Sequence, residues 1–212
     1  MFTGIIEEVG RVAGVEVDGE RRRLTVSCSK VLPKIKEGDS VSVSGVCLTV
    51  VRIDKDFFAA DLAQETWVRT SFARVKPGAL VNLELPMRAD GRFDGHVVQG
   101  HVDGVGTVMS FQPVAHGNDY VLGINVPSEL TRYIVAKGSL TIEGTSLTVA
   151  AIEGTQVRVA IIPHTADVTN LRSIEAGDPV NLEVDVIAKY VEKLFGFAKS
   201  SITLEKLVRA GF

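Results

Sequence analysis

The stretch GVCLTV at residues 45–50 returns in the second half of the chain as GTSLTV at residues 144–149. The two copies lie 99 positions apart, and the same shift aligns VNLE at residues 81–84 with VNLE at residues 180–183. Agreement at several points in one register indicates a duplicated structural unit, because a chance match would be confined to one place. The sequence therefore predicts two homologous domains.

The boundaries of the two domains follow from the same comparison. Gly4 and Gly10 align with Gly100 and Gly106 at a shift of 96, so about three residues are inserted after this opening segment. The joint at residues 87–95 is polar and glycine-rich, as linkers usually are. A chain of 212 residues suits two domains of about 100 residues each. We expect an N-terminal domain at 1–96, a C-terminal domain at 97–186 and a separate tail at 187–212.

Each repeat has the pattern of short β-strands. RLTVS at residues 23–27, SVSV at 40–43 and QVRVAI at 156–161 alternate or are rich in β-branched residues, and glycines or prolines separate them. Several such strands within about 90 residues favour a small closed barrel, because closure removes exposed sheet edges. The predicted class is therefore all-β, with short helical turns around residues 127–135.

The tail has a different periodicity. Its apolar residues recur at i, i+4, i+7 and i+8, with charged residues on the opposite face, which is typical of an amphipathic helix. The first stripe consists of Ile187, Val191, Leu194 and Phe195, and a second stripe after Gly196 consists of Leu204, Leu207 and Val208. The helix must bury this stripe either on its own barrels or by self-association, and the sequence favours neither.

Composition excludes several classes of protein. Hydrophobic residues make up 45% of the chain and charged residues 23%, which is typical of a globular protein and not of a disordered one. The net charge of −3 and the isoelectric point near 5.8 provide no basic field for nucleic acid or an anionic membrane. The one cationic run, RRR at residues 21–23, follows DGE at 18–20 and is interpreted as a solvated hairpin tip.

The expected location is the cytoplasm. No apolar run reaches the roughly 18 residues that span a bilayer, and the start MFTGIIEE carries acids where a signal peptide has an apolar core. The two cysteines, Cys28 and Cys47, form no CxxC pair, so we expect free thiols and neither a disulfide framework nor a zinc site.

The repeated motif carries candidate binding groups. In an extended strand, Cys47 and Thr49 would point to one face, while the leucine and valine of the motif point to the other. The second copy would present Ser146 and Thr148 on the equivalent face. A thiol and small hydroxyls directed at a barrel mouth can hydrogen-bond a flat heterocycle, and their duplication favours a ligand cradle over a merely structural role.

The two predicted cradles differ in their chemistry. The positions that break the symmetry are Cys47 against Ser146, Ile5 against His101, Gly38 against Lys137, and QET at 64–66 against PHT at 163–165. A duplicated pocket with unequal chemistry suits a protein that holds two similar molecules and treats them differently.

The segment GHVVQGH at residues 95–101 raises the question of a metal site. A spacing of five places His96 and His101 on opposite faces of a regular strand, and no CxxC, HExxH or carboxylate cluster lies nearby. We therefore expect no metal. The chain contains no GxGxxG motif at this segment and no phosphate-binding GxxxxGK[ST] motif, so neither a dinucleotide fold nor a P-loop is indicated.

Four features together resemble the two-repeat, lumazine-binding riboflavin synthase family over essentially the whole chain: the MFTGI start, the GxCLTV and GxSLTV pair, the GHxxxGH segment and the amphipathic tail. The resemblance implies two six-stranded Greek-key β-barrels and a C-terminal helix, assembled as a homotrimer. It also implies a transferase reaction, the last step of riboflavin biosynthesis. Two molecules of 6,7-dimethyl-8-ribityllumazine exchange a four-carbon unit and give riboflavin and 5-amino-6-ribitylaminouracil, without a metal or redox cofactor.

The resemblance also implies the site residues. The first pocket would contain Cys47, Leu48, Thr49, Asp61, Leu62, Ala63, Gln64, Glu65 and Thr66, closed by Gly100, His101 and Val102. The second would contain Ser146, Leu147, Thr148, Ile162, Pro163, His164, Thr165, Ala166 and Asp167, closed by Gly4, Ile5 and Ile6. In the family, the opening segment of each repeat reaches the ligand of the other barrel, and Lys137 would arrive from a neighbouring subunit.

Four of these residues are candidates for catalysis: Cys47, His101, Lys137 and Ser146. His101 suits a proton shuttle, because histidine titrates near neutral pH. Cys47 suits a transient nucleophile at ring carbon 7, although water could do the same and leave the thiol as a positioning group. A structural role is expected for His96, and the role of His164 is left open.

Two other classes of protein remain as alternatives. A non-catalytic lumazine- or flavin-binding protein, of the optical antenna type, would share the fold and the repeat but would be expected to lose residues of one cradle. A barrel that binds single-stranded nucleic acid would need a basic groove with stacking aromatic residues, and aromatic residues make up only 6% of this chain.

Overall fold

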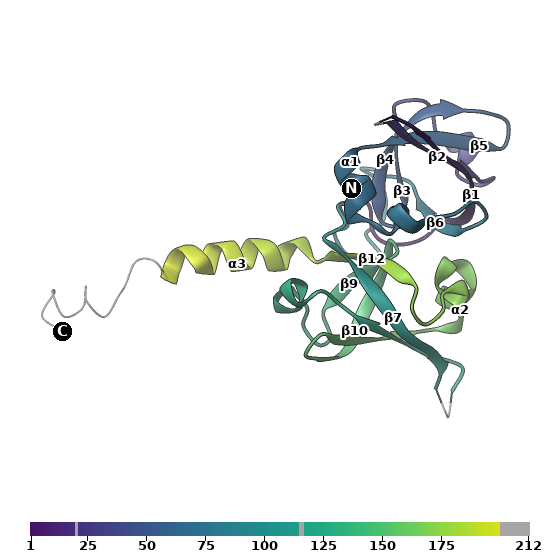
Figure 1. Ribbon diagram of the computed structural model, residues 1–212. Coiled ribbons are helices and arrows are strands. Elements are labelled where there is room, and N and C mark those ends of the chain that lie inside the picture. Colours follow the sequence, from purple (N-terminus) through teal and green to yellow (C-terminus); the bar gives the residue numbers. More distant parts are fainter. Residues whose placement is uncertain (20, 115–116, 200–212) are drawn as a thin grey trace, which may run out of the picture.

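The computed structural model describes residues 1–19, 21–114 and 117–199, and these form two closed six-stranded barrels followed by a helix (Figure 1). The strands of barrel 1 are β1 (Glu8–Asp18), β2 (Arg21–Ser27), β3 (Ser40–Val43), β4 (Val46–Ile53), β5 (Phe57–Leu62) and β6 (Leu80–Glu84). The strands of barrel 2 are β7 (Gly104–Pro113), β8 (Tyr120–Asn125), β9 (Ser139–Ile142), β10 (Thr145–Glu153), β11 (Gln156–Ile161) and β12 (Pro179–Val184).

Both barrels have the same strand order. Barrel 1 closes as β1-β2-β5-β4-β3-β6, and barrel 2 closes in the equivalent order, with every neighbouring pair antiparallel. Because β2 lies beside β5 and not beside β3, the connection is a Greek key. The fold class expected from the repeat is thereby confirmed.

Short helical segments join the strands and also follow the repeat. Barrel 1 has η1 (Leu32–Lys34), α1 (Gln64–Arg69) and η2 (Ser71–Arg74), and barrel 2 has η3 (Ser128–Tyr133), α2 (Pro163–Val168) and η4 (Asn170–Ser173). The predicted strands at 40–43 and 156–161 coincide with β3 and β11, and the predicted turns around 127–135 contain η3.

Each barrel encloses its own hydrophobic core. In barrel 1 the largest fully buried side chains include Leu24, Phe58 and Phe72, and in barrel 2 they include Leu122 and Ile142. These aliphatic and aromatic side chains fill each barrel, so neither interior is open to a ligand.

The cationic run at 21–23 differs from the prediction of a solvated hairpin tip. Asp18 pairs with Arg21 in the β1–β2 ladder, so the turn precedes the run and the three arginines open strand β2. The Arg23 side chain donates to Asp61 at 2.7 Å, and the guanidinium of Arg22 lies 5.8 Å from the Trp67 ring centroid. The run is therefore committed to contacts within barrel 1.

The two barrels meet at their repeated hairpin turns. Ser44 and Gly45 between β3 and β4, and Glu143 and Gly144 between β9 and β10, all have positive φ, as a two-residue type I′ turn requires. The two turns lie back to back: a Cβ atom built on Gly45 would lie 2.8 Å from the Gly144 nitrogen. The contact is so close that only glycine fits at either position.

Buried asparagines join the barrels around these turns. The Asn82 amide donates to the Glu143 carbonyl at 2.8 Å, and its counterpart Asn181 donates to the Ser44 carbonyl at 3.0 Å. Each repeat thus binds the other through the same atoms, which gives the pair an approximate two-fold relation.

Helix α3 (Val186–Lys199) follows barrel 2 and extends away from both barrels (Figure 1). Its charged face is tied to barrel 2, because Lys189 binds Asp103 at 2.6 Å and Tyr133 donates to Glu192 at 2.5 Å. The amphipathic helix predicted at the start of the tail is confirmed, and the second predicted stripe at residues 204–208 lies outside the described residues.

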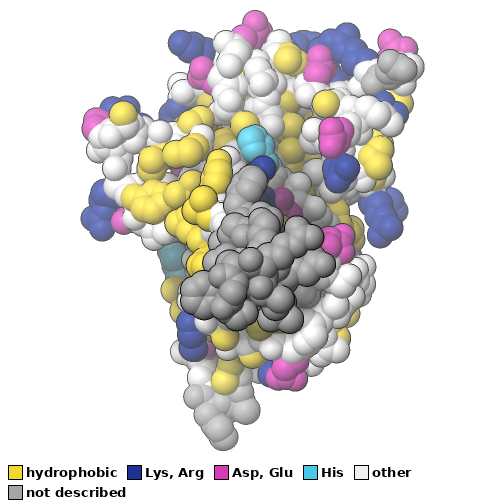
Figure 2. All heavy atoms as spheres, turned by 90° about the vertical axis from the view of Figure 1, so that its left-hand side faces the viewer, with side chains coloured by type: hydrophobic (Ala, Val, Ile, Leu, Met, Phe, Trp, Pro, Cys, Tyr) yellow, Lys and Arg dark blue, Asp and Glu magenta, His cyan; other side chains and the backbone are white. Residues whose placement is uncertain are grey.

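The apolar stripe of α3 is exposed. Leu194 and Phe195 keep 69% and 68% of their surface accessible. Further hydrophobic side chains gather on the face from which the tail emerges (Figure 2). None of the helices in the described part of the chain has the length and apolar character needed to span a bilayer.

Candidate functional site

The first cradle, the surface around Cys47 and Thr49 on strand β4, lies on the outer wall of barrel 1. Along β4, Leu48 and Val50 point into the core, whereas Cys47 is half-buried and Thr49 is exposed on the outside. The predicted alternation of faces is confirmed. The predicted position at a barrel mouth is wrong, because the interior is filled and the thiol and hydroxyl face outward.

The second cradle repeats this arrangement on barrel 2. Along β10, Ser146 is half-buried and Thr148 is exposed, while Leu147 and Val149 are in the core. The two cradles therefore offer similar outer surfaces and differ at the half-buried position, which carries a thiol in one and a hydroxyl in the other.

The opening segment of each repeat crosses to the cradle of the other barrel. The Cys47 nitrogen donates to the Gly100 carbonyl at 2.8 Å, and the Ser146 nitrogen donates to the Gly4 carbonyl at the same distance. A Cβ atom on Gly100 would lie 2.6 Å from the Cys47 Cβ, and φ is +79° at this glycine. Both features require glycine, because a side chain would clash with the strand and L-residues avoid this backbone conformation.

The crossing brings His101 and Val102 to barrel 1. Val102 packs against the core of that barrel, although it belongs to the second repeat. His101 follows Gly100 directly, and its side chain is exposed. On the other side, Ile5 follows Gly4 and is also exposed, while Ile6 is half-buried.

The predicted segments after β5 and β11 form α1 and α2. Because β5 pairs with β4 with Val50 opposite Ala60, its continuation past Leu62 runs beside the strand that carries Cys47. Several residues that were predicted to contact the ligand instead make contacts within the protein. Leu62 and Ala166 are buried in the cores, the Asp61 carboxylate accepts from Arg23, and Asp167 pairs with Arg172.

The remaining predicted residues of these segments are at the surface or partly covered. They are Ala63, Gln64, Glu65 and Thr66 beside the first cradle, and Ile162, Pro163, His164 and Thr165 beside the second. These residues are the ones that a ligand on the outer wall could reach.

Lys137 is not brought to Cys47 within one chain. It is exposed on barrel 2, with φ of +67°, and its backbone nitrogen donates to the Val149 carbonyl at 2.8 Å. Cys47, in contrast, contacts Gly100, the residue that precedes His101. A role for Lys137 at the first cradle therefore needs a second copy of the chain.

His96 contributes more to the second cradle than the sequence indicated. Its Nδ1 lies 2.7 Å from the Ser146 hydroxyl, and its Nε2 lies 3.0 Å from the Thr141 hydroxyl. Burial lowers the pKa of His96, so the neutral ring is favoured and one nitrogen must donate while the other accepts. The ring thus fixes the orientation of the Ser146 hydroxyl.

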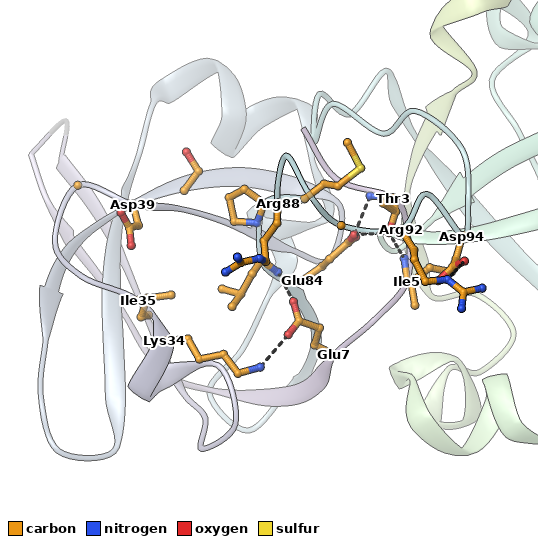
Figure 3. Close-up of a pocket in the computed structure, with 16 residues that line it drawn as sticks. Thr3, Ile5, Glu7, Lys34, Ile35, Asp39, Glu84, Arg88, Arg92 and Asp94 are labelled. Carbon is orange, nitrogen blue, oxygen red and sulfur yellow. Dashed lines mark hydrogen bonds and ion pairs between the residues drawn. The ribbon is translucent and has the colours of Figure 1, made fainter.

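A cavity of about 860 Å³ lies between barrel 1 and the linker that follows it (Figure 3). Of the predicted site residues only Ile5 lines it. The rest of its wall comes from the opening segment, η1, the start of β3, the end of β6 and the linker after β6. Its cations are engaged: Lys34 pairs with Glu7 at 3.1 Å, and the arginines of the linker pair with linker aspartates. The cations that line the cavity are thus paired with carboxylates of the same chain.

Among the described residues, no group of three or more His, Cys, Asp or Glu side chains is placed to hold a metal ion. Both cysteines are free and half-buried.

The fold defines a class of protein built from two copies of one six-stranded Greek-key barrel. The family model for the lumazine binding domain matches the chain twice, at residues 3–86 and 99–185. The solved structure of LumP complexed with 6,7-dimethyl-8-(1'-D-ribityl) lumazine is similar with a TM-score of 0.78 and 27% sequence identity, covering 87% of this chain and 99% of that one. The structure of LumP complexed with riboflavin has a TM-score of 0.80, with the same identity and coverage.

More similar relatives in sequence are riboflavin synthases. That of Actinobacillus pleuropneumoniae is 45% identical over 217 residues, with all of both chains covered. That of Bacillus subtilis is 39% identical, covering 99% of this chain and 97% of the relative. The chain belongs to the riboflavin synthase family.

Proposed function

We propose that the chain catalyses the dismutation of two 6,7-dimethyl-8-ribityllumazine molecules, a four-carbon transfer that yields riboflavin and 5-amino-6-ribitylaminouracil. The observation that supports the proposal is that one chain carries both cradle scaffolds. Each has the outward-facing polar pair and a crossing segment from the other repeat. Two equal scaffolds with unequal chemistry suit two copies of one substrate, one of which donates carbons while the other accepts them.

The asymmetric residues take unequal roles in this reaction. His101, exposed beside the first cradle, shuttles protons to and from the lumazine. Of the two cysteines, only Cys47 lies in a cradle, and burial raises the pKa of the Cys28 thiol to about 12. Cys47 is therefore the thiol available as a transient nucleophile at ring carbon 7, with water as the alternative. Ser146, held by His96 at 2.7 Å, hydrogen-bonds the ligand of the second cradle.

Orientation supplies a large part of the acceleration. Holding two rings face to face can lower the barrier by about 7 to 11 kcal/mol without any chemical group. We propose that the reaction needs no metal or redox cofactor, since proton transfer and addition to the ring require only the side chains named above.

The proposed assembly is a homotrimer held by the tail, in which Lys137 of one subunit reaches the first cradle of the next. The exposed stripe of α3 and the exposure of Lys137 on barrel 2 support this arrangement. The free thiols of both cysteines support a reducing compartment, and we propose the cytoplasm.

A turnover assay tests the proposed function. The purified chain, incubated with 6,7-dimethyl-8-ribityllumazine and a chelator but no added cofactor, is expected to form riboflavin and 5-amino-6-ribitylaminouracil in equal amounts, measured by chromatography. The matched control is the same protein after thermal unfolding. Tight binding of the lumazine without turnover would instead assign the chain to the non-catalytic lumazine-binding class.

Replacing Leu194 in α3 by aspartate is expected to convert the assembly to monomers. Leu194 keeps 69% of its surface exposed in the single chain, so the substitution removes apolar contact area only if another subunit covers it. Sedimentation velocity measures the outcome, with Lys193→Ala on the charged face as the control. An unchanged trimer in the Leu194 variant would clear the helix of the assembly role.

A further inference from the structure

Two buried glutamates occupy the same position in the two barrels. Glu84 ends β6 and Glu183 lies near the end of β12, and they keep only 3% and 2% of their surface accessible. Both are the last residue of the repeated VNLE motif, at residues 81–84 and 180–183. A buried carboxylate is costly unless it is well hydrogen-bonded, so the partners of these two groups are informative.

The Glu183 carboxylate binds three consecutive backbone amides of one segment. Its Oε1 accepts from the Gln99 nitrogen at 2.6 Å, and its Oε2 accepts from the nitrogens of Gly100 and His101 at 2.9 Å each. Three amides that converge on one carboxylate fix the peptide planes on both sides of Gly100. They therefore fix the point from which the His101 side chain leaves the backbone.

The same segment is in contact with the first cradle. The Gly100 carbonyl accepts from the Cys47 nitrogen at 2.8 Å, and the Gly100 and Cys47 backbones are too close to admit a Cβ atom. A continuous series of contacts thus runs from Glu183 in barrel 2, through residues 99–101, to Cys47 in barrel 1.

Glu84 makes the equivalent contacts in the opposite direction. Its Oε1 accepts from the Thr3 nitrogen at 2.6 Å and from the Thr3 hydroxyl at 2.7 Å (Figure 3). Its Oε2 accepts from the Gly4 nitrogen at 2.9 Å. The Gly4 carbonyl in turn accepts from the Ser146 nitrogen. The series runs from barrel 1 to the second cradle.

We infer that Glu183 is a positioning residue for the cradle that contains Cys47, and that Glu84 is the positioning residue for the cradle that contains Ser146. Each barrel supplies the buried carboxylate that sets the geometry of the other barrel's site. The consequence for lumazine binding rests on the proposed function, whereas the consequence for the geometry around Cys47 does not.

Glutamine is the discriminating substitution. Burial raises the pKa of both glutamates and the amide hydrogen bonds lower it, so the anion depends on those amides for its stability. Glu183→Gln keeps the size of the side chain but turns one acceptor into a donor that faces backbone N–H groups. The segment at 99–101 should then shift away from Cys47, while the barrels stay closed.

Alkylation of Cys47 reports on the first cradle alone. In the full chain, iodoacetamide labelling followed by peptide mass spectrometry is expected to be about ten-fold faster at Cys47 in Glu183→Gln than in the parent, from the loss of one charged hydrogen bond. Glu84→Gln is the matched control and should leave the rate at Cys47 unchanged. Cys28, whose thiol has a pKa raised to about 12 by burial, is the internal reference for global unfolding.

Protection by ligand tests the same point for binding. The concentration of 6,7-dimethyl-8-ribityllumazine that halves the labelling rate of Cys47 should rise about ten-fold or more in Glu183→Gln, and it should rise less in Glu84→Gln, which acts on the other cradle. If the lumazine does not protect Cys47 of the parent at any concentration, the proposed function fails. The labelling rates measured without ligand still test the positioning role of Glu183.

Two outcomes would overturn the inference: equal labelling of Cys47 in both glutamine variants, or a parent-like rate in Glu183→Gln. Should Glu183→Gln fail to fold, as judged by accelerated labelling of Cys28, Gly100→Ala disturbs the same contact from the other side. That variant leaves Glu183 in place and is expected to show the same selective acceleration at Cys47, and a parent-like rate there would equally contradict the series of contacts.

Discussion

Replacing His101 by asparagine should lower kcat for riboflavin formation by about a hundred-fold to ten-thousand-fold, the usual contribution of a general acid or base. The segment that carries His101 is held through its backbone by Glu183 and by the Cys47 nitrogen, so the substitution removes the imidazole without releasing the segment. Asparagine can still donate and accept a hydrogen bond but cannot transfer a proton. The expected signature is therefore a loss in kcat with little change in KM.

The matched control is His164→Asn. His164 is also an exposed histidine, but it lies on α2 beside the second cradle. If both variants lose the same activity, the proton shuttle cannot be assigned to the first cradle. Thermal unfolding of both variants, measured in parallel, separates a catalytic loss from a folding defect.

Cys47→Ser gives the first cradle the chemistry of the second and completes this experiment. A hydroxyl is a far weaker nucleophile than a thiol at neutral pH, so turnover should fall if the thiol adds to the ring. A small effect would assign the addition to water. Undiminished turnover in both the Cys47 and the His101 variants would remove the two proposed roles together.

The repeat made much of the fold predictable from the sequence. A register that holds at GVCLTV, VNLE and the opening glycines constrains both halves of the chain at once, and period-two patterns then define strands such as β3 and β11. The predicted faces of Cys47 and Thr49 were right for the same reason: alternation along a strand is a local property.

The placement of the cradles was less predictable, because it depends on contacts between residues far apart in the chain. Alternation separates two faces but does not say which one a filled barrel interior will occupy, so a barrel mouth was expected where the structure has an outer wall. Likewise, no local sequence pattern indicates that His96 hydrogen-bonds Ser146, or that Arg23 forms an ion pair with Asp61. Glu183 is 82 to 84 positions away from the amides it binds.

Gly45 offers the largest expected effect on stability. Alanine at this position must adopt φ near +81°, which costs about 1 to 2 kcal/mol, and its Cβ would lie 2.8 Å from the Gly144 nitrogen. The neighbour is backbone at the contact between the barrels, so relief requires the turns to separate, and overpacking of this kind adds about 1 to 3 kcal/mol. We expect Gly45→Ala to lower the free energy of unfolding by about 2 to 5 kcal/mol in urea titration.

Gly154→Ala separates the two contributions to that loss. Gly154 also has a positive φ, of +60°, but a Cβ atom there would meet nothing within 4 Å, so only the conformational cost of about 1 to 2 kcal/mol should appear. An equal loss in both variants would show that the contact between Gly45 and Gly144 is not tight. A larger loss at Gly45 should also be accompanied by reduced turnover, because Cys47 and Ser146 each follow these turns by two residues and depend on the same contact for their relative position.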